Sequence, residues 1–268
     1  PVQIRVGVEP GRPLVIEVPR EIATGKDADD GSEITSADFG YPTPATAVPP
    51  TAAMPDGPQW VLEHWSNLNN VFQFIRIEDT AYDRKNPRIM YMADTGEPRA
   101  IPHANGRLQR GGSTTVGNYM NGRLWKIELG KKNPRLGAKL SILPNANFDL
   151  NGYANANSPH QPDNMETTKH AIWFQEDTGG HNSSAPAAHF PPFPNATNAR
   201  IWRYDLKTGA LTVVAEVNQN VPGAPTTLAK GAWESSGIVD ASRAFGRGAF
   251  LVDVQAHGWD VPAGGGND

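Results

Sequence analysis

The sequence predicts an all-β protein, a β-propeller of four-stranded antiparallel blades that is incomplete in this chain. Short runs of alternating aromatic and β-branched residues, bounded by Gly and Asp, are typical of antiparallel strands. The 27 glycines and 24 prolines of the 268 residues suit many strands joined by many turns. One sequence pattern, here called the phrase, also occurs three times. It consists of acidic residues, an apolar strand that ends on acidic residues, a polar loop, a strand of the type R-[LI]-W-[KR] and a last strand. Repeats of this length favour propeller blades.

Residues 1–59 are expected to form an N-terminal region of their own. Gln3–Val8 and Leu14–Val18 alternate like the two strands of a hairpin. The stretch 22–58 is rich in Asp, Thr, Ala and Pro and is expected to form little regular structure. Within it, 26–33 (KDADDGSE) is expected to be a solvated acidic turn, since its acids do not have the spacing of an EF-hand loop.

Residues 60–268 are assigned to the propeller blades, and their first element is a short helix over Trp60–Asn69. In the first copy of the phrase, Phe72–Asp79 is predicted to be a strand that ends on acids, and Ile89–Gly96 the next strand. Two further strands are predicted, at Gly122–Leu129 and Ala138–Leu143.

The second copy runs from Pro162 to Val217. Its strand Ala171–Phe174 ends on Glu176-Asp177, and two more strands follow at Arg200–Leu206 and Ala210–Val217. The third copy starts at Trp233 and reaches AFLVDVQAHG, but no outer strands follow. We therefore expect a propeller that is incomplete in this chain and open to association with another chain.

The repeat places acidic and amide side chains where the predicted strands begin and end. In a propeller the innermost strands line a shared channel, so equivalent positions of successive blades converge. Clustered carboxylates repel one another unless a cation or a proton neutralises them, and Ca²⁺ prefers oxygen ligands. The alternative is that each acid caps a turn or pairs with a nearby Arg. The candidate metal ligands are Glu78, Asp79, Asp163, Asn164, Glu176, Asp177, Glu234 and Asp253.

Histidine and aromatic residues also occupy positions that indicate their roles. His257 alternates with Asp253 and Gln255, so the three side chains share one face of a strand. His257 is thus a candidate ligand, a candidate general acid, or simply a hydrogen-bonded residue. Histidines in the polar loops are expected to face solvent: His160, His181 and His189. Aromatic residues on strands are expected to pack between blades: Trp125, Trp173, Phe174, Trp202 and Tyr204.

Composition excludes several kinds of site and partner. The net charge of −4 gives no electrostatic reason to expect nucleic acid or an anionic membrane, and no apolar run reaches membrane-spanning length. The absence of cysteine excludes disulfides and thiolate sites, and it fits a bacterial periplasmic or extracellular protein. No nucleophile elbow, P-loop or dinucleotide fingerprint is present, so any hydrolysis is expected to be metal-assisted.

Taken together, the phrases resemble the PhoX-type bacterial alkaline phosphatase family. The resemblance spans roughly Phe72 to His257 and rests on F-x-R-x-E-D with Y-D-x-x-N-P, Thr95-Gly96, GRLWKIEL, PDNM, WFQEDTGG, ARIWRYDLKTGAL, WESSGIVDAS and AFLVDVQAHG. It implies a secreted or periplasmic β-propeller that hydrolyses phosphomonoesters, with calcium and iron at the end of the central channel. The characterised enzymes use a cysteine at their iron, so the absence of cysteine here argues for calcium and against iron.

The resemblance also implies roles for individual residues. Glu78, Asp163, Asn164, Glu176 and Glu234 become the channel ligands, while Arg76 and His257 become the catalytic residues that contact the phosphoryl group. The expected function is therefore metal-dependent hydrolysis of a small phosphorylated substrate. Two alternatives remain: a non-catalytic, calcium-stabilised propeller that serves as a binding or structural module, and a calcium-dependent lactonase or esterase-like hydrolase.

Overall fold

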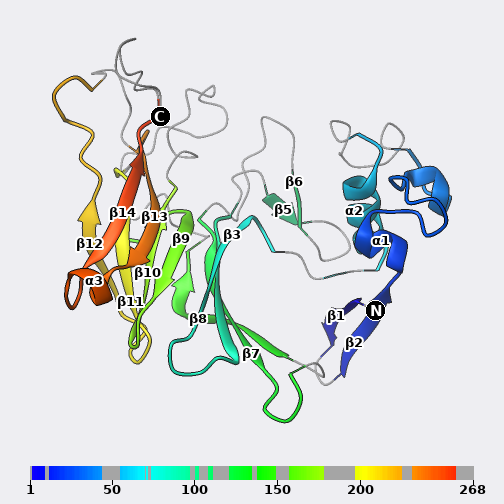
Figure 1. Ribbon diagram of the computed structural model, residues 1–268, viewed down its shortest axis with the longest axis horizontal. Coiled ribbons are helices and arrows are strands. Elements are labelled where there is room, and N and C mark those ends of the chain that lie inside the picture. The colour runs from blue at the N-terminus through cyan, green and yellow to red at the C-terminus, as the bar shows by residue number, and fades with distance from the viewer. Residues whose placement is uncertain are drawn as a thin grey trace. The chain divides into compact units, whose positions relative to one another are not determined.

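The chain is mainly composed of β-strands and divides into two compact units, which are described separately (Figure 1). One unit comprises Pro1–Gln73 with Pro102–Gly112, and the other Phe74–Ile101 with Ser113–Asp268. The computed structural model describes residues 2–9, 12–43, 55–69, 71, 74–96, 100–102, 108–110, 121–134, 138–148, 157–177, 197–224 and 231–257. Within these ranges, no helix has both the length and the apolar character that a membrane crossing requires.

The first unit begins with the predicted hairpin, formed by β1 (Val2–Glu9) and β2 (Arg12–Val18). The predicted helix is also confirmed, as α2 (Pro58–Leu68), with Pro58 in the first turn, where its missing N–H costs nothing. The expectation of little regular structure before it is wrong at α1 (Arg20–Thr24) and at the 3₁₀ helix η1 (Ser36–Phe39).

A small apolar core explains those two short helices. It joins the end of β2, α1, the segment before η1 and α2, and its buried members are Val18, Ile22, Ile34, Trp60, Val61 and Trp65. The acidic stretch 26–33 is a solvated turn, as predicted, because Asp27 Oδ1 accepts the backbone N–H groups of Asp29 and Asp30 at 2.8 and 3.2 Å. The Pro-rich run 44–54 lies outside the described residues.

The second unit contains two four-stranded antiparallel sheets in meander order, as the repeated phrase predicts. The first sheet consists of β3 (Ile77–Tyr82), β4 (Ile89–Asp94), β7 (Arg123–Leu129) and β8 (Ala138–Asn147). The second consists of β9 (Pro162–Thr167), β10 (Ala171–Glu176), β11 (Arg200–Asp205) and β12 (Leu211–Glu216).

A two-stranded sheet corresponds to the third copy of the phrase. It pairs β13 (Glu234–Asp240) with β14 (Phe250–Gln255), and α3 (Ser242–Phe245) lies between them in sequence. Two short strands lie outside these sheets, β5 (Ala100–Pro102) and β6 (Leu108–Arg110). The coarse prediction of four-stranded antiparallel sheets is thus confirmed, and the structure shows no closed propeller among the described residues.

One predicted strand is misplaced. The sequence pattern predicts a strand over Phe72–Asp79 that ends on acids, whereas β3 begins at Ile77 and continues to Tyr82. Arg76 has a φ of 60°, in the left-handed region, and this breaks the extended backbone just before Ile77. Glu78 and Asp79 therefore lie at the start of β3, as Asp163 and Asn164 do in β9 and Glu234 does in β13.

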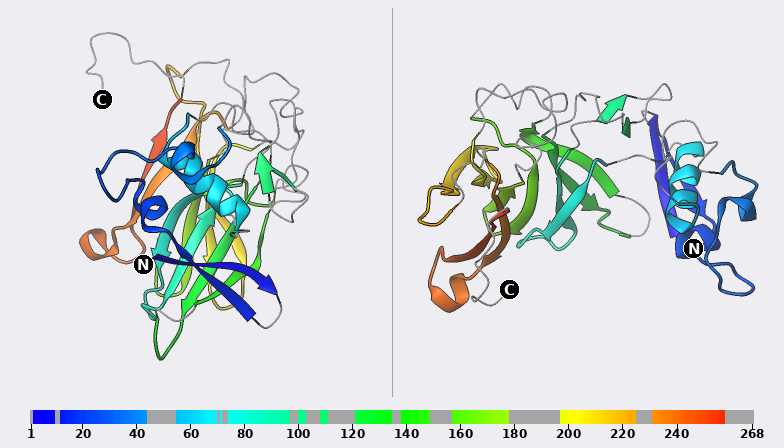
Figure 2. Two further views of the ribbon diagram at one scale, coloured as in Figure 1. Left: turned by 90° about the vertical axis from the view of Figure 1, so that its right-hand side faces the viewer. Right: turned by 90° about the horizontal axis from the view of Figure 1, so that it is seen from above.

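The sheets of the second unit pack against one another through apolar side chains, and this confirms the predicted packing role of four aromatic residues. The core between the two four-stranded sheets is formed by Tyr91, Ala93, Leu124, Leu143, Ala146, Phe148, Met165, Ile172, Phe174, Trp202 and Tyr204. Trp173 lies against Phe250 of β14, with ring centroids 4.5 Å apart, and so links the second sheet to the third. Strand β9 contacts both β3 and β13, so the first strands of the three sheets lie side by side (Figures 1 and 2).

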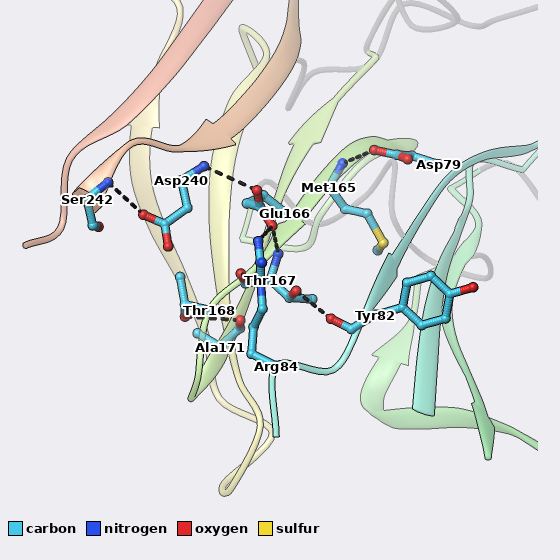
Figure 3. Close-up of polar contacts among 10 residues, drawn as sticks. All are labelled: Asp79, Tyr82, Arg84, Met165, Glu166, Thr167, Thr168, Ala171, Asp240 and Ser242. Carbon is cyan, nitrogen blue, oxygen red and sulfur yellow. Dashed lines mark hydrogen bonds and ion pairs between the residues drawn. The ribbon is translucent and has the colours of Figure 1, made fainter. Parts of the chain in front are cut away.

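Polar side chains also tie these three strands together (Figure 3). Asp79 Oδ2 of β3 accepts the backbone N–H of Met165 in β9 at 2.8 Å. Glu166 of β9 accepts a hydrogen bond from Arg84 at 2.7 Å through Oε1 and the backbone N–H of Asp240 in β13 at 3.2 Å through Oε2. The first strands are therefore held in a fixed order, β3–β9–β13.

Candidate metal centre

The register of the sheets brings the beginnings of the first strands and the ends of the second strands to one edge. Ile77 pairs with Asp94, Pro162 with Glu176, and Glu234 with Gln255. Because these pairs are antiparallel, the acids at the start of one strand lie near the acids at the end of its neighbour. The predicted convergence of acidic positions thus follows from the strand pairing.

The same backbone turn precedes β3 and β9. Arg76 and Gln161 both have a positive φ, 60° and 46°, and each lies directly before its strand. The carbonyl of Arg76 accepts the N–H of Thr95 at 2.9 Å, and the carbonyl of Gln161 accepts the N–H of Asp177 at 3.0 Å. A positive φ is uncommon for residues other than glycine, so the repetition of this turn marks it as a specific feature of this edge.

At this edge Asp163, Asp177 and Glu234 form a cluster, here called the acidic triad. One carboxylate oxygen from each lies within 4.8 Å of the other two, and all three residues are partly buried. Asp163 is the second residue of β9, Asp177 follows β10, and Glu234 begins β13. The acidic triad therefore contains two acids from the open end of the β9–β10 hairpin and one acid from the third sheet.

Three further polar side chains surround the acidic triad: Arg76, Glu78 and His257. The guanidinium of Arg76 lies 3.2 Å from Glu78 Oε1 through Nε and 3.6 Å from Asp177 Oδ2 through Nη2. The Nε2 atom of His257 lies 3.6 Å from Glu234 Oε2. Both side chains are considerably more exposed than the triad, at 38% for Arg76 and 50% for His257. The two residues predicted to be catalytic thus lie beside the acidic triad, where a substrate could reach them.

The electrostatics of the acidic triad favour a bound cation or proton. Burial, the charge and hydrogen bond of Asp177, and the charge of Asp163 raise the pKa of Glu234 to about 8, although Arg76 opposes the change. Burial and the charges of Asp177 and Glu78 raise the pKa of Asp163 to about 6, again against the effect of Arg76. At neutral pH the triad therefore retains a proton unless a cation replaces it.

Glu176 was predicted to be a metal ligand, but the structure does not bring it into the acidic triad. Its side chain is fully buried, and its oxygens accept hydrogen bonds from the Arg200 guanidinium at 2.9 and 3.0 Å and from the Trp202 indole at 2.8 Å. Glu176 thus forms the ion pair with arginine that was the alternative interpretation, and Asp177, the next residue, reaches the triad.

The other four predicted ligands lie in three different surroundings. Glu78 flanks the acidic triad through Arg76. Asp79 and Asn164 connect neighbouring strands, since Asn164 Oδ1 accepts the backbone N–H of Gly237 in β13 at 3.0 Å, as Asp79 does for β9. Asp253 lies opposite Ser236 on the exposed strand β14 and is not part of the triad.

The sequence prediction overlooked two buried residues near this edge. His160 was expected to face solvent, yet it is 1% exposed and its backbone N–H binds Glu176 Oε1 at 2.8 Å. Gln161 is fully buried and supplies the turn before β9. A useful signal was its position, because Gln161 stands in the second copy where Arg76 stands in the first. His181 and His189 lie outside the described residues.

The donor set of the acidic triad fits a hard divalent cation. Calcium takes six to eight oxygen ligands at about 2.3–2.6 Å, so two oxygens bound to one ion lie at most about 5 Å apart. The three triad oxygens meet this limit. Comparison of the chain with protein-family models, with curated proteins and with solved structures finds no match in any of the three.

Proposed function

We propose that this protein is a calcium-dependent phosphoric ester hydrolase with the architecture of a propeller, and that it acts outside the bacterial cytoplasm. The observation that carries the proposal is an arginine beside three partly buried carboxylates that share a space of one ion's size. Carboxylates alone would repel a phosphate, whereas a cation held by them and the guanidinium of Arg76 would both attract its oxygens.

Each residue has a definite task in this proposal. Asp163, Asp177 and Glu234 hold the ion, which would polarise the phosphoryl group and activate a water molecule. Arg76 stabilises the negative charge that develops on the phosphoryl oxygens in the transition state. His257, next to Glu234 and half exposed, donates a proton to the leaving oxygen. Calcium is preferred to iron because the set contains oxygen donors only and the sequence has no cysteine.

The propeller architecture is supported by the internal repeat. Two meander sheets have the same strand order, a third hairpin begins in the same way, and the first strands β3, β9 and β13 lie side by side. A radial arrangement of blades places such strands around a common axis. The acidic triad would then lie at one end of that axis, where a small phosphorylated substrate can enter.

A second candidate function is a calcium-stabilised propeller without catalytic activity. One observation favours it: the guanidinium of Arg76 already contacts the carboxylates of Glu78 and Asp177. An arginine that serves only to balance acidic charge would not bind a phosphate. The two candidates differ in turnover but not in calcium binding, so a single set of assays separates them.

The test is hydrolysis of p-nitrophenyl phosphate at alkaline pH, with calcium and with a chelator. We expect calcium-dependent turnover that is lost in Glu234→Gln and retained in Glu216→Gln, a matched change on the exposed strand β12. If calcium raises the melting temperature of the wild type but no turnover is observed, the result would support the non-catalytic module. Absence of both effects would refute the calcium site itself.

A further inference from the structure

Glu176 and Asp94 occupy equivalent places in the two four-stranded sheets. Each ends the second strand of its sheet, and each accepts the indole N–H of a tryptophan in the third strand: Trp202 at 2.8 Å and Trp125 at 3.0 Å. Each also accepts a backbone N–H from the residue two positions before the first strand of the sheet, His160 at 2.8 Å and Ile75 at 3.3 Å. We call these two arrangements the Glu176 junction and the Asp94 junction.

The Glu176 junction is the more extensive of the two. The carboxylate is completely buried and binds Arg200, itself 4% exposed, through Nε, Nη2 and the backbone N–H at 2.9–3.0 Å. The Arg200 guanidinium also lies over the Trp202 ring, 4.7 Å from its centroid, and donates to the carbonyl of Ser158 at 2.8 Å. A buried carboxylate with this many donors is rigidly held.

Two residues of the acidic triad are attached directly to this junction. Asp177 follows Glu176 in the chain, and its backbone N–H binds the carbonyl of Gln161 at 3.0 Å. Gln161 in turn follows His160, whose N–H is held by Glu176, and Asp163 comes two residues later. The single carboxylate of Glu176 therefore connects the two chain segments that carry Asp163 and Asp177.

We propose that Glu176 is a positioning residue that sets the separation of Asp163 and Asp177 and thereby the affinity of the acidic triad for calcium. The inference rests on the proposed calcium site. The first sheet supplies a built-in comparison, because the Asp94 junction is followed by Thr95 and not by an acid. Loss of either junction should loosen its own sheet edge, but only loss of the Glu176 junction should affect calcium.

The first measurement uses protein without calcium, so that it does not depend on the proposed function. Amide hydrogen exchange is followed by NMR at Asp177 and at Thr95, whose N–H groups bind the carbonyls of Gln161 and Arg76. In Glu176→Gln we expect exchange at Asp177 to accelerate about tenfold or more relative to Thr95, since a buried charged acceptor is lost. In Asp94→Asn the ratio should change in the opposite direction. Unchanged ratios in both variants would overturn the proposal.

The second measurement is calcium binding by isothermal titration calorimetry. We expect Glu176→Gln to weaken calcium binding about tenfold or more, whereas Asp94→Asn should stay within about twofold of the wild type. Equal losses in the two variants would show a general effect of destabilisation and would contradict the proposal. If the wild type binds no calcium while the exchange ratios change as expected, the calcium site fails and the positioning of Asp177 by Glu176 stands.

If Glu176→Gln alone does not fold, a double variant provides the test. Removing one partner of a buried ion pair leaves an uncompensated charge, whereas removing both often costs little. The double variant Glu176→Gln/Arg200→Gln removes the buried cation together with its partner. We expect it to fold and to show the same rise in exchange at Asp177 and the same loss of calcium affinity; wild-type values of both would overturn the proposal.

Discussion

One carboxylate oxygen of Glu234, at the start of β13, lies within 4.8 Å of an oxygen of Asp177, which follows β10 in a different sheet. Two carboxylates this close repel each other unless one of them carries a proton or a cation binds both. Burial and the charges of Asp177 and Asp163 raise the pKa of Glu234 to about 8. The acidic triad is therefore a place where we expect the stability of the fold to depend on pH and, under the proposed function, on calcium.

The first prediction concerns pH in the absence of calcium. The pKa values of Asp163 and Glu234 are about 6 and about 8 in the folded protein, above the usual values of 3.8 and 4.5. Between about pH 4 and pH 8 the folded state thus binds more protons than the unfolded state, so the free energy of unfolding should fall as pH rises and level off above pH 8.

Thermal unfolding in chelator across this pH range checks the prediction. The double variant Asp163→Asn/Glu234→Gln should show a shallower fall than the wild type, because its two altered groups no longer titrate. Added calcium should raise the wild-type melting temperature most at high pH, where it need not displace protons. Parallel pH profiles for wild type and double variant would contradict the prediction.

The second prediction concerns Arg76. Its guanidinium lowers the pKa of both Asp163 and Glu234, so Arg76→Met should raise these two pKa values further. The substitution also removes a positive charge that repels a cation at the acidic triad. Hydrolysis of p-nitrophenyl phosphate should fall about 100-fold, the typical loss when one group that stabilises transition-state charge is removed. Arg84→Met is the control, since Arg84 binds Glu166 away from the triad. Equal activity in the two variants would remove Arg76 from the mechanism.

The third prediction assigns a structural role to Asn164. Its Oδ1 accepts the N–H of Gly237 at 3.0 Å and the hydroxyl of Ser236 at 3.2 Å, so it joins β9 to β13. Asn164→Ala should lower the free energy of unfolding by about 1–2 kcal/mol, the usual effect of losing such bonds. Denaturant unfolding with and without calcium measures this effect. Calcium should still stabilise the Asn164→Ala variant. If calcium no longer stabilised it, Asn164 would have to be a calcium ligand.

The strands were predictable from the sequence because alternation and turn residues are local signals. The phrase with R-[LI]-W located β7 and β11, and the meander order of both sheets follows from short connections. The start of β3 was not predictable, because arginine has no preference for the left-handed conformation that Arg76 adopts, with a φ of 60°. Arg76 and Gln161 occupy equivalent positions, directly before the first strand of each four-stranded sheet. Comparison of the two sheets therefore shows that the same turn precedes both strands.

The acidic site could be located only to within a residue or two. Glu176 and Asp177 are adjacent acids at the end of β10, and adjacent side chains of a strand face opposite sides. Which one reaches the acidic triad depends on the position of Arg200, 24 residues further along the chain, whose guanidinium binds Glu176. A long-range partner of this kind has no local signature, so the sequence predicts both acids as ligands and does not distinguish between them.

The last prediction uses the close approach of two chain segments at the Asp94 junction. Gly122 has a φ of 63°, and a Cβ atom placed on it would lie 1.6 Å from the carbonyl oxygen of Asp94. Gly122→Ala should therefore separate the start of β7 from the end of β4 and lower the free energy of unfolding by about 3 kcal/mol or more.

Gly248 provides a matched control for that change. Its φ of 84° is also positive, but nothing lies within 4 Å of the corresponding Cβ position. Gly248→Ala should cost only the strain of the left-handed conformation, about 1–2 kcal/mol. Denaturant unfolding of the two variants separates steric overlap from backbone strain, and equal losses would show that the approach of Gly122 to Asp94 is not needed for the sheet.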